Sequence, residues 1–188
     1  MTDKTLEVYN KITRLKDEDR TRRGWIDRKV PGRIESVAEH CFAMSNLAIL
    51  LNAEYNLNLD MEKVLTMINI HEYGEIYVGD IIPKDGISKE EKYQKELEAI
   101  AMVMGKYPRN KKIINLWIEF ESLETDEAIF VFLLDKFQSV LQAKEYAEKY
   151  QMPEVYEEFI NWYNSSVVTK VKNHPLTRIL SLSNKSCI

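Results

Sequence analysis

The chain has 188 residues, a length that suits one compact domain. It is 45% hydrophobic and 30% charged, with only 6 Gly and 5 Pro, a composition typical of a globular protein rich in helix. Its net charge of −4 argues against general binding to nucleic acid polymers or membranes.

The first half of the chain predicts three helices. Apolar residues recur at helical spacing in the first of them, at Leu6, Tyr9, Ile12 and Leu15. Residues 17–34 are polar and read as a loop. Ser36 followed by Glu39 is a capping-box pattern, which predicts that the second helix begins at Ser36. A third helix is expected to begin near Asp60 and to end near residues 74–79.

The second half of the chain predicts four further helices after a loop at residues 76–87. Their expected ranges are about 88–105, 109–123, 125–149 and 154–165. Alternating patterns of apolar and polar residues, which would indicate strands, are missing. The chain is therefore expected to fold as an all-α protein with a single domain over residues 1–188.

The cysteines and the N-terminus favour a cytoplasmic location. Only Cys41 and Cys187 are present, without a CxxC pair, so a disulfide framework is not expected. The first residues contain no apolar stretch that resembles a signal peptide. The longest purely apolar run, residues 128–134, is too short to span a bilayer.

Asp135 is the most informative single residue, because it directly follows the apolar run of residues 128–134 inside a predicted helix. An ionised carboxylate in apolar surroundings costs several kcal/mol unless a positive charge holds it. His40 and the adjacent pair His71 and Glu72 lie on two other apolar segments. Two imidazoles and two carboxylates suit one divalent transition metal (Mn, Co, Fe, Ni or Zn) better than Ca or Mg.

Each of these residues also has a structural interpretation. A single histidine on an amphipathic helix is more often structural than a ligand. Glu72 alone would usually belong to a solvated face, and Asp135 alone can be the partner of a buried Lys or Arg. The combination on three apolar segments, rather than any one residue, indicates a metal site.

Two further acids lie close to the histidine pair in sequence. A zinc-protease motif needs a second histidine four residues after the first, and the chain has Glu75 at that position, so this class is not expected. Glu75 falls on the same helical face as His71 and suits proton transfer near the ion. Asp80 lies between apolar neighbours in a loop, where a turn or capping role is about equally supported.

Taken in order, these motifs resemble the HD-domain metal-dependent phosphohydrolase superfamily, and within it the 5′-deoxyribonucleotidase-like branch. The match covers roughly residues 14–150, with residues 151–188 expected to pack on that core. It is carried by residues 22–25, residues 35–40 with His40, the pair His71–Glu72 with Glu75, residues 79–83, residues 89–92, residues 116–121, the pair Asp135–Lys136, and residues 142–146.

The resemblance implies a helical bundle around one divalent metal, with His40, His71, Glu72 and Asp135 as its ligands. In the family the second histidine is followed by Asp, and here it is followed by Glu72. The additional methylene moves the carboxylate by about 1.5 Å. The resemblance also suggests Glu75 and Asp80 as active-site acids that handle the water, the leaving group or the sugar.

The basic segment at residues 11–33 has a net charge of +5, and the rest of the chain has −9. Arginines from this segment, Arg22 or Arg23 together with Arg33, are expected to bind a substrate phosphate. The sequence leaves open which of Arg22 and Arg23 does so. Trp25 supplies a ring for a base or sugar, or alternatively fills the core.

The expected function is hydrolysis of nucleoside 5′-monophosphates, mainly deoxyribonucleotides, by a metal-dependent phosphomonoesterase. One alternative is a nucleotide-binding regulatory protein with an altered or weakly catalytic HD site, and another is an HD phosphodiesterase or triphosphohydrolase. The expected partners are a small nucleotide and a second copy of the chain. Aromatic residues between Tyr146 and Tyr163 either pack internally, which is commoner, or form that interface.

Overall fold

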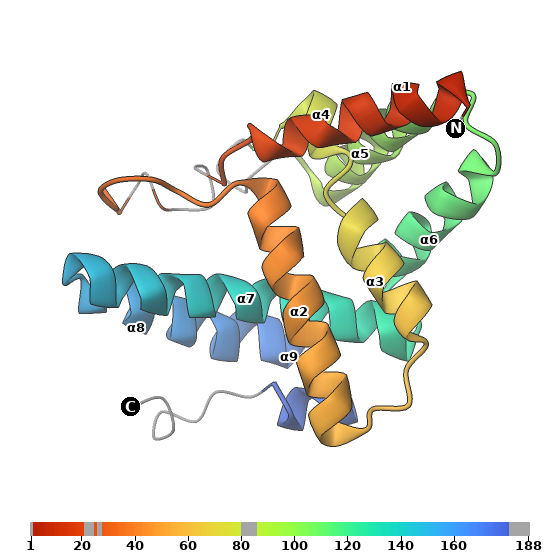
Figure 1. Cartoon of the computed structure of the whole chain (residues 1–188). Helices are drawn as coiled ribbons and strands as arrows, with labels where there is room; N and C mark the ends of the chain where they lie inside the picture. The colour runs from red at the N-terminus through yellow and green to blue at the C-terminus, as the bar shows by residue number, and fades with distance from the viewer. Residues whose placement is uncertain (1, 21–24, 26–27, 80–85, 181–188) are drawn as a thin grey trace.

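The protein is built from helices, as a computed structural model shows (Figure 1). The structure describes residues 2–20, 25, 28–79 and 86–180. Within those ranges the only pairing of extended backbone is an isolated antiparallel bridge between Asp19 and Ser36. The expectation of an all-α fold is therefore confirmed.

The N-terminal half has the three predicted helices, but the third ends earlier than expected, at Ile70, and a separate short helix lies at Glu75–Val78. Its elements are α1 (Asp3–Ile12), a 3₁₀ turn (Thr13–Lys16), α2 (Val37–Tyr55), α3 (Met61–Ile70) and α4 (Glu75–Val78). Ser36 caps α2 in the predicted capping box, since its hydroxyl accepts from the Glu39 backbone and its own N–H donates to the Glu39 carboxylate. Asp60 likewise caps α3 by accepting from the Lys63 backbone.

The C-terminal half also matches the predicted ranges, with one difference. Its elements are α5 (Lys89–Met104), α6 (Asn110–Ser122), α7 (Asp126–Tyr150), α8 (Pro153–Trp162), a π-helical turn (Tyr163–Val167), α9 (Val168–Lys170) and a 3₁₀ turn (Pro175–Arg178). The α-helical part of the segment expected at residues 154–165 is α8, which ends at Trp162. The backbone then continues through the π-helical turn into α9. Tyr163 and Val167, the first and last residues of that turn, are both buried.

Helix α7 lies at the centre of the packing, in contact with α2, α3, α6 and α8 (Figure 1). Its long apolar segment contributes several fully buried side chains, Leu133 and Leu134 among them, each worth about 1.5–3 kcal/mol of burial. The main core cluster extends from Trp25 to Leu180, so the described C-terminal residues pack into the same core as α2 and α7.

The described helices include none with the length and apolar character needed to cross a membrane.

Candidate metal centre

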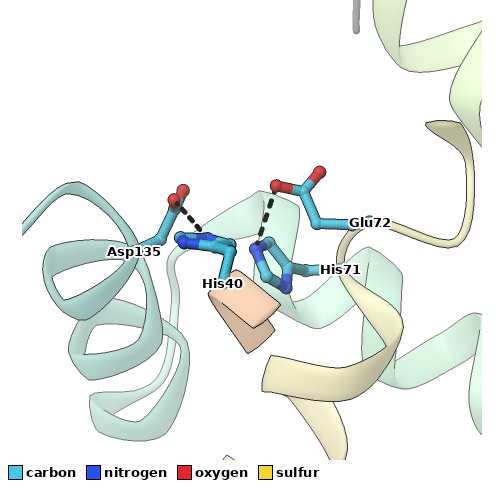
Figure 2. A group of neighbouring side chains, drawn as sticks. All are labelled: His40, His71, Glu72 and Asp135. Carbon is cyan, nitrogen blue, oxygen red and sulfur yellow. Dashed lines mark ion pairs between the residues drawn. The ribbon is translucent and has the colours of Figure 1, made fainter. Parts of the chain in front are cut away.

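Four side chains from three separate segments of the chain meet at the point where α2, the end of α3 and α7 converge (Figure 2). His40 lies in the first turn of α2, His71 and Glu72 directly follow α3, and Asp135 lies in the middle of α7. Each offers one ligand atom, and these atoms all lie within 4.8 Å of one another. All four side chains are buried.

Hydrogen bonds on the far side of each imidazole determine which ring nitrogen faces the cluster. Nδ1 of His71 lies 2.7 Å from the carbonyl oxygen of Ile68, which can only accept, so Nδ1 carries the proton. Nδ1 of His40 lies 2.6 Å from Oε1 of Gln138. The amide of Gln138 is oriented by Glu35, because its Nε2 donates to Oε2 of Glu35 at 3.0 Å. In its neutral form each imidazole therefore presents an unprotonated Nε2 to the cluster.

These Nε2 atoms fit a metal ion well. Nε2 of His40 lies 3.2 Å from Oδ1 of Asp135, and Nε2 of His71 lies 3.3 Å from Oε1 of Glu72 (Figure 2). Within the described part of the chain, neither buried Nε2 has a hydrogen-bond partner. Two buried nitrogen lone pairs beside two carboxylates are the donor set of a transition-metal site with mixed ligands.

The pKa values of the two histidines are shifted in opposite directions. Burial, with a contribution from the charge of Arg20, lowers the pKa of His40 to about 4, so this ring is neutral at physiological pH. Burial also lowers the pKa of His71, but the carboxylates of Glu72 and Asp135 outweigh it and raise the pKa above its ordinary value. Metal binding therefore competes with a proton mainly at His71.

Arg20 is a site residue that the sequence analysis missed. Its guanidinium donates to Oε1 of Glu72 at 3.0 Å and lies 3.5 Å from Oε1 of Glu35 and 3.8 Å from Oδ1 of Asp135. The backbone N–H of Arg20 donates to the Glu35 carbonyl, which holds it beside the start of α2. The formal charges of the arginine and these three carboxylates sum to −2, and a divalent ion would neutralise that charge.

Gln138 was also missed, although it leaves a signal in the sequence. It lies three residues after Asp135, and residues with that spacing share one face of a helix. Arg20 leaves no comparable signal, because it is one of nine basic residues in the segment from Lys11 to Arg33.

The other predicted site residues are placed as follows. Glu75 is buried as the first residue of α4, three residues after Glu72. Arg33 has a side chain that is 72% exposed and donates to Oε2 of Glu39 at 2.7 Å, so it belongs to the surface cap of α2. Arg22, Arg23 and Asp80 lie outside the described residues.

Trp25 lies in the core. Its ring is 1% exposed, stacks on Phe159 at 4.6 Å between centroids, and meets Tyr146 edge-on at 5.1 Å. Of the two interpretations of Trp25, the geometry supports the one in which the ring fills the core.

A cavity of about 220 Å³ adjoins the cluster. His71, Glu72 and Asp135 form part of its wall, so three of the four candidate ligands face space that a small molecule can enter.

Two curated proteins with similar sequences are both named as 5′-deoxynucleotidases. The 5′-deoxynucleotidase HDDC2 of Dictyostelium discoideum is 35% identical over 189 residues, which cover 96% of each chain. The 5′-deoxynucleotidase hdd1 of Schizosaccharomyces pombe is 33% identical over 173 residues, covering 89% of this chain and 81% of the relative.

Two solved structures share the fold. A protein from Pyrococcus horikoshii has a TM-score of 0.68 at 21% identity and covers 94% of this chain and 98% of its own. A predicted metal-dependent phosphohydrolase from Magnetospirillum magnetotacticum has a TM-score of 0.65 at 24% identity, covering 94% of this chain and 89% of its own. The model of the HD domain family matches residues 12–174, nearly the whole chain, and the chain therefore belongs to that family.

Proposed function

We propose that the protein is a metal-dependent phosphomonoesterase that releases phosphate from nucleoside 5′-monophosphates, with deoxyribonucleotides as the expected substrates. The observation that carries the proposal is the convergence of two histidine Nε2 atoms and two carboxylates beside an open cavity. The names of the relatives from Dictyostelium discoideum and Schizosaccharomyces pombe support the choice of substrate.

His40, His71, Glu72 and Asp135 would hold the metal. A divalent ion held by these residues would supply Lewis-acid chemistry at a phosphoryl oxygen and at a water. The mixed nitrogen and oxygen ligands favour Mn, Fe, Co, Ni or Zn over Mg. The hydrogen bonds from Gln138 and the Ile68 carbonyl keep both rings oriented, which is the usual role of groups behind histidine ligands.

Glu75 is proposed as the acid that moves a proton at the reacting phosphate, because it is buried and follows Glu72 by three residues. Asp80 and one of the two arginines Arg22 and Arg23 remain proposed substrate contacts. Arg33 and Trp25 have weaker support for such a role, since one is exposed at the cap of α2 and the other is packed in the core.

Arg20 supports a second candidate, a nucleotide-binding regulatory protein with weak catalysis. Its guanidinium contacts both candidate ligand carboxylates, at 3.0 Å for Glu72 and 3.8 Å for Asp135. A buried cation in that place competes with a metal ion for the same oxygens. The two functions differ in turnover rather than in binding, so kinetics separate them.

The phosphomonoesterase proposal is tested by phosphate release from a panel of ribo- and deoxyribonucleoside monophosphates, with Mn, Co, Zn, Fe(II) and Mg added separately to chelator-treated protein. Release that depends on a transition metal and prefers deoxyribonucleotides is the expected result. Nucleotide binding without phosphate release under any metal would favour the regulatory candidate.

A homodimer in the cytoplasm completes the proposal. The aromatic residues Tyr146, Phe159 and Tyr163 are buried within the chain, which leaves a different surface for the partner. Helix α2 exposes Phe42 (72%) and Leu50 (64%) together with Ile49. Light scattering should give twice the mass of the 22.1 kDa chain, and Leu50→Glu should shift the mass toward the monomer. A wild-type protein that is monomeric at every concentration would refute the dimer.

A further inference from the structure

The cavity beside the candidate metal ligands is lined by three lysines from three different helices. Lys92 comes from α5, Lys136 from α7 and Lys170 from α9. The helices that carry them are separated in sequence, so only the fold brings the three ammonium groups to one cavity. None of the three was singled out as a substrate contact from the sequence.

Two of the three lysines pair with neighbouring acids, and the third, Lys170, has no acid partner among the described residues. Nζ of Lys136 pairs with Asp135, and Nζ of Lys92 lies 3.5 Å from Oε1 of Glu96. Nζ of Lys170 lies 4.5 Å above the ring of Phe132, and no described carboxylate is within ion-pair distance of it. Cations that converge on one cavity repel one another unless an anion enters.

A metal ion in the cluster would change the balance of charge around the cavity. Without an ion, the carboxylates of Glu72 and Asp135 in the wall offset the lysines. An ion would take up both of those charges and, with them, the partner of Lys136. Glu96 and Glu121 are the other two acids in the wall, and burial raises the pKa of Glu96 to about 7 and the pKa of Glu121 above its ordinary value, so each is less fully ionised than an exposed glutamate. With an ion bound, the three lysines outnumber these two acids. The loaded cavity is therefore cationic and suits an anion.

We propose that Lys92, Lys136 and Lys170 form the subsite that holds the phosphate group of the substrate next to the metal. The proposal rests on the proposed phosphomonoesterase function and specifies it further, because it assigns the phosphate to lysines of α5, α7 and α9. Lysine ammonium groups bind phosphate oxygens as mobile point charges with three donors each. The position of Lys136 beside Asp135 makes phosphate binding depend on prior metal binding.

The test is calorimetric titration of inorganic phosphate into the metal-loaded protein, with Lys170→Met and Lys136→Met as variants. Methionine keeps most of the length of the side chain and removes the charge. Two lysines outside the cavity provide matched controls, Lys95→Met on α5 and Lys144→Met on α7, whose partners are Glu91 and Glu148.

Each cavity variant should raise the Kd for phosphate by about tenfold or more, as expected for a lost charge-assisted contact. The control variants should change it by no more than about twofold. Wild-type protein treated with chelator should bind phosphate at least about tenfold more weakly than the loaded protein. Cavity variants that bind as tightly as the controls would overturn the proposal.

Circular dichroism melts establish whether each variant folds. Should Lys136→Met fail to fold, Lys170→Met decides, because Lys170 is exposed and its loss leaves no buried group unpaired. Phosphate release by the wild type, measured in parallel, separates the two proposals. An active wild type with unaffected variants refutes the subsite alone, whereas an inactive wild type whose variants lose phosphate binding refutes the function alone.

Discussion

Oε1 of Gln138 lies 2.6 Å from Nδ1 of His40, on the opposite side of the ring from the metal cluster. This contact favours the tautomer of His40 with the proton on Nδ1, because the hydrogen bond from Nε2 of Gln138 to Glu35 turns the amide oxygen of Gln138 toward the ring. The metal site is therefore oriented by a residue that does not itself reach the ion.

Gln138→Leu should lower metal affinity by about 10–100-fold, the usual effect of removing the partner behind a histidine ligand. Competition with a chelating indicator measures the change. Gln142→Leu, one turn further along α7, is the control, since Gln142 bonds to Glu145 at the surface. Equal affinities for the two variants would show that Gln138 does not position His40.

Arg20→Met should destabilise the metal-free protein by about 3–5 kcal/mol, because Glu35, Glu72 and Asp135 then lose a buried cation. Added metal should restore most of that loss, since the ion replaces the missing positive charge. Urea unfolding with chelator and with metal gives both values. Arg28→Met removes the partly exposed pair with Glu158 and should cost no more than about 1 kcal/mol in either condition. If added metal does not restore the free energy of unfolding that Arg20→Met loses, then Arg20 does not balance the charge of the candidate metal ligands.

Trp25→Ala should destabilise the fold by about 3–5 kcal/mol, because the ring is buried between Phe159 and Tyr146. Discrimination among sugars and bases should stay the same in the folded fraction. Thermal melts and a panel of nucleotide substrates, measured on this one variant, give the two quantities. If Trp25→Ala instead changes the selectivity among nucleotides and leaves the melting temperature unchanged, then Trp25 contacts the substrate.

Glu96 should make the metal-free protein less stable as the pH rises. Burial raises its pKa to about 7, above the 4.5 of an unperturbed glutamate, so the folded state holds this proton more tightly than the unfolded state does. The stabilising contribution of Glu96 to the free energy of unfolding is roughly 3 kcal/mol. It is fully present below pH 4.5 and is lost as the pH rises from 4.5 to about 7. Glu96→Gln should remove that slope from the unfolding free energy, and Glu98→Gln, an exposed residue of α5, should keep it. Parallel slopes for the two variants would contradict the assignment.

Local signals in the sequence predicted most of the secondary structure. Ser36 and Asp60 mark the starts of α2 and α3 because a helix N-terminus is capped by its immediate neighbours. The change to a π turn at Tyr163 was not predicted, since no proline or glycine marks it.

The candidate ligands were found because two histidines and two carboxylates on three apolar segments form an unusual combination, although each residue alone has a structural interpretation. Arg20 and Lys170 were not found, because their roles depend on contacts between distant segments. Arg20 meets Glu72 and Asp135 only after the chain folds, and Lys170 meets Phe132 in the same way. An aromatic residue such as Trp25 suits both a core and a substrate site, and only its packing separates the two.

Helix α7 carries Asp135, Lys136 and Gln138 within a single turn, and its remaining faces pack against α2, α3, α6 and α8. A one-residue insertion upstream in α7 would rotate all three side chains together by about 100° away from His40. The site should therefore tolerate changes of length in the turn between α5 and α6, and should lose its geometry on any change of length between Asp126 and Asp135. A scan of single-residue insertions along the chain would show this as an interval in which metal binding disappears.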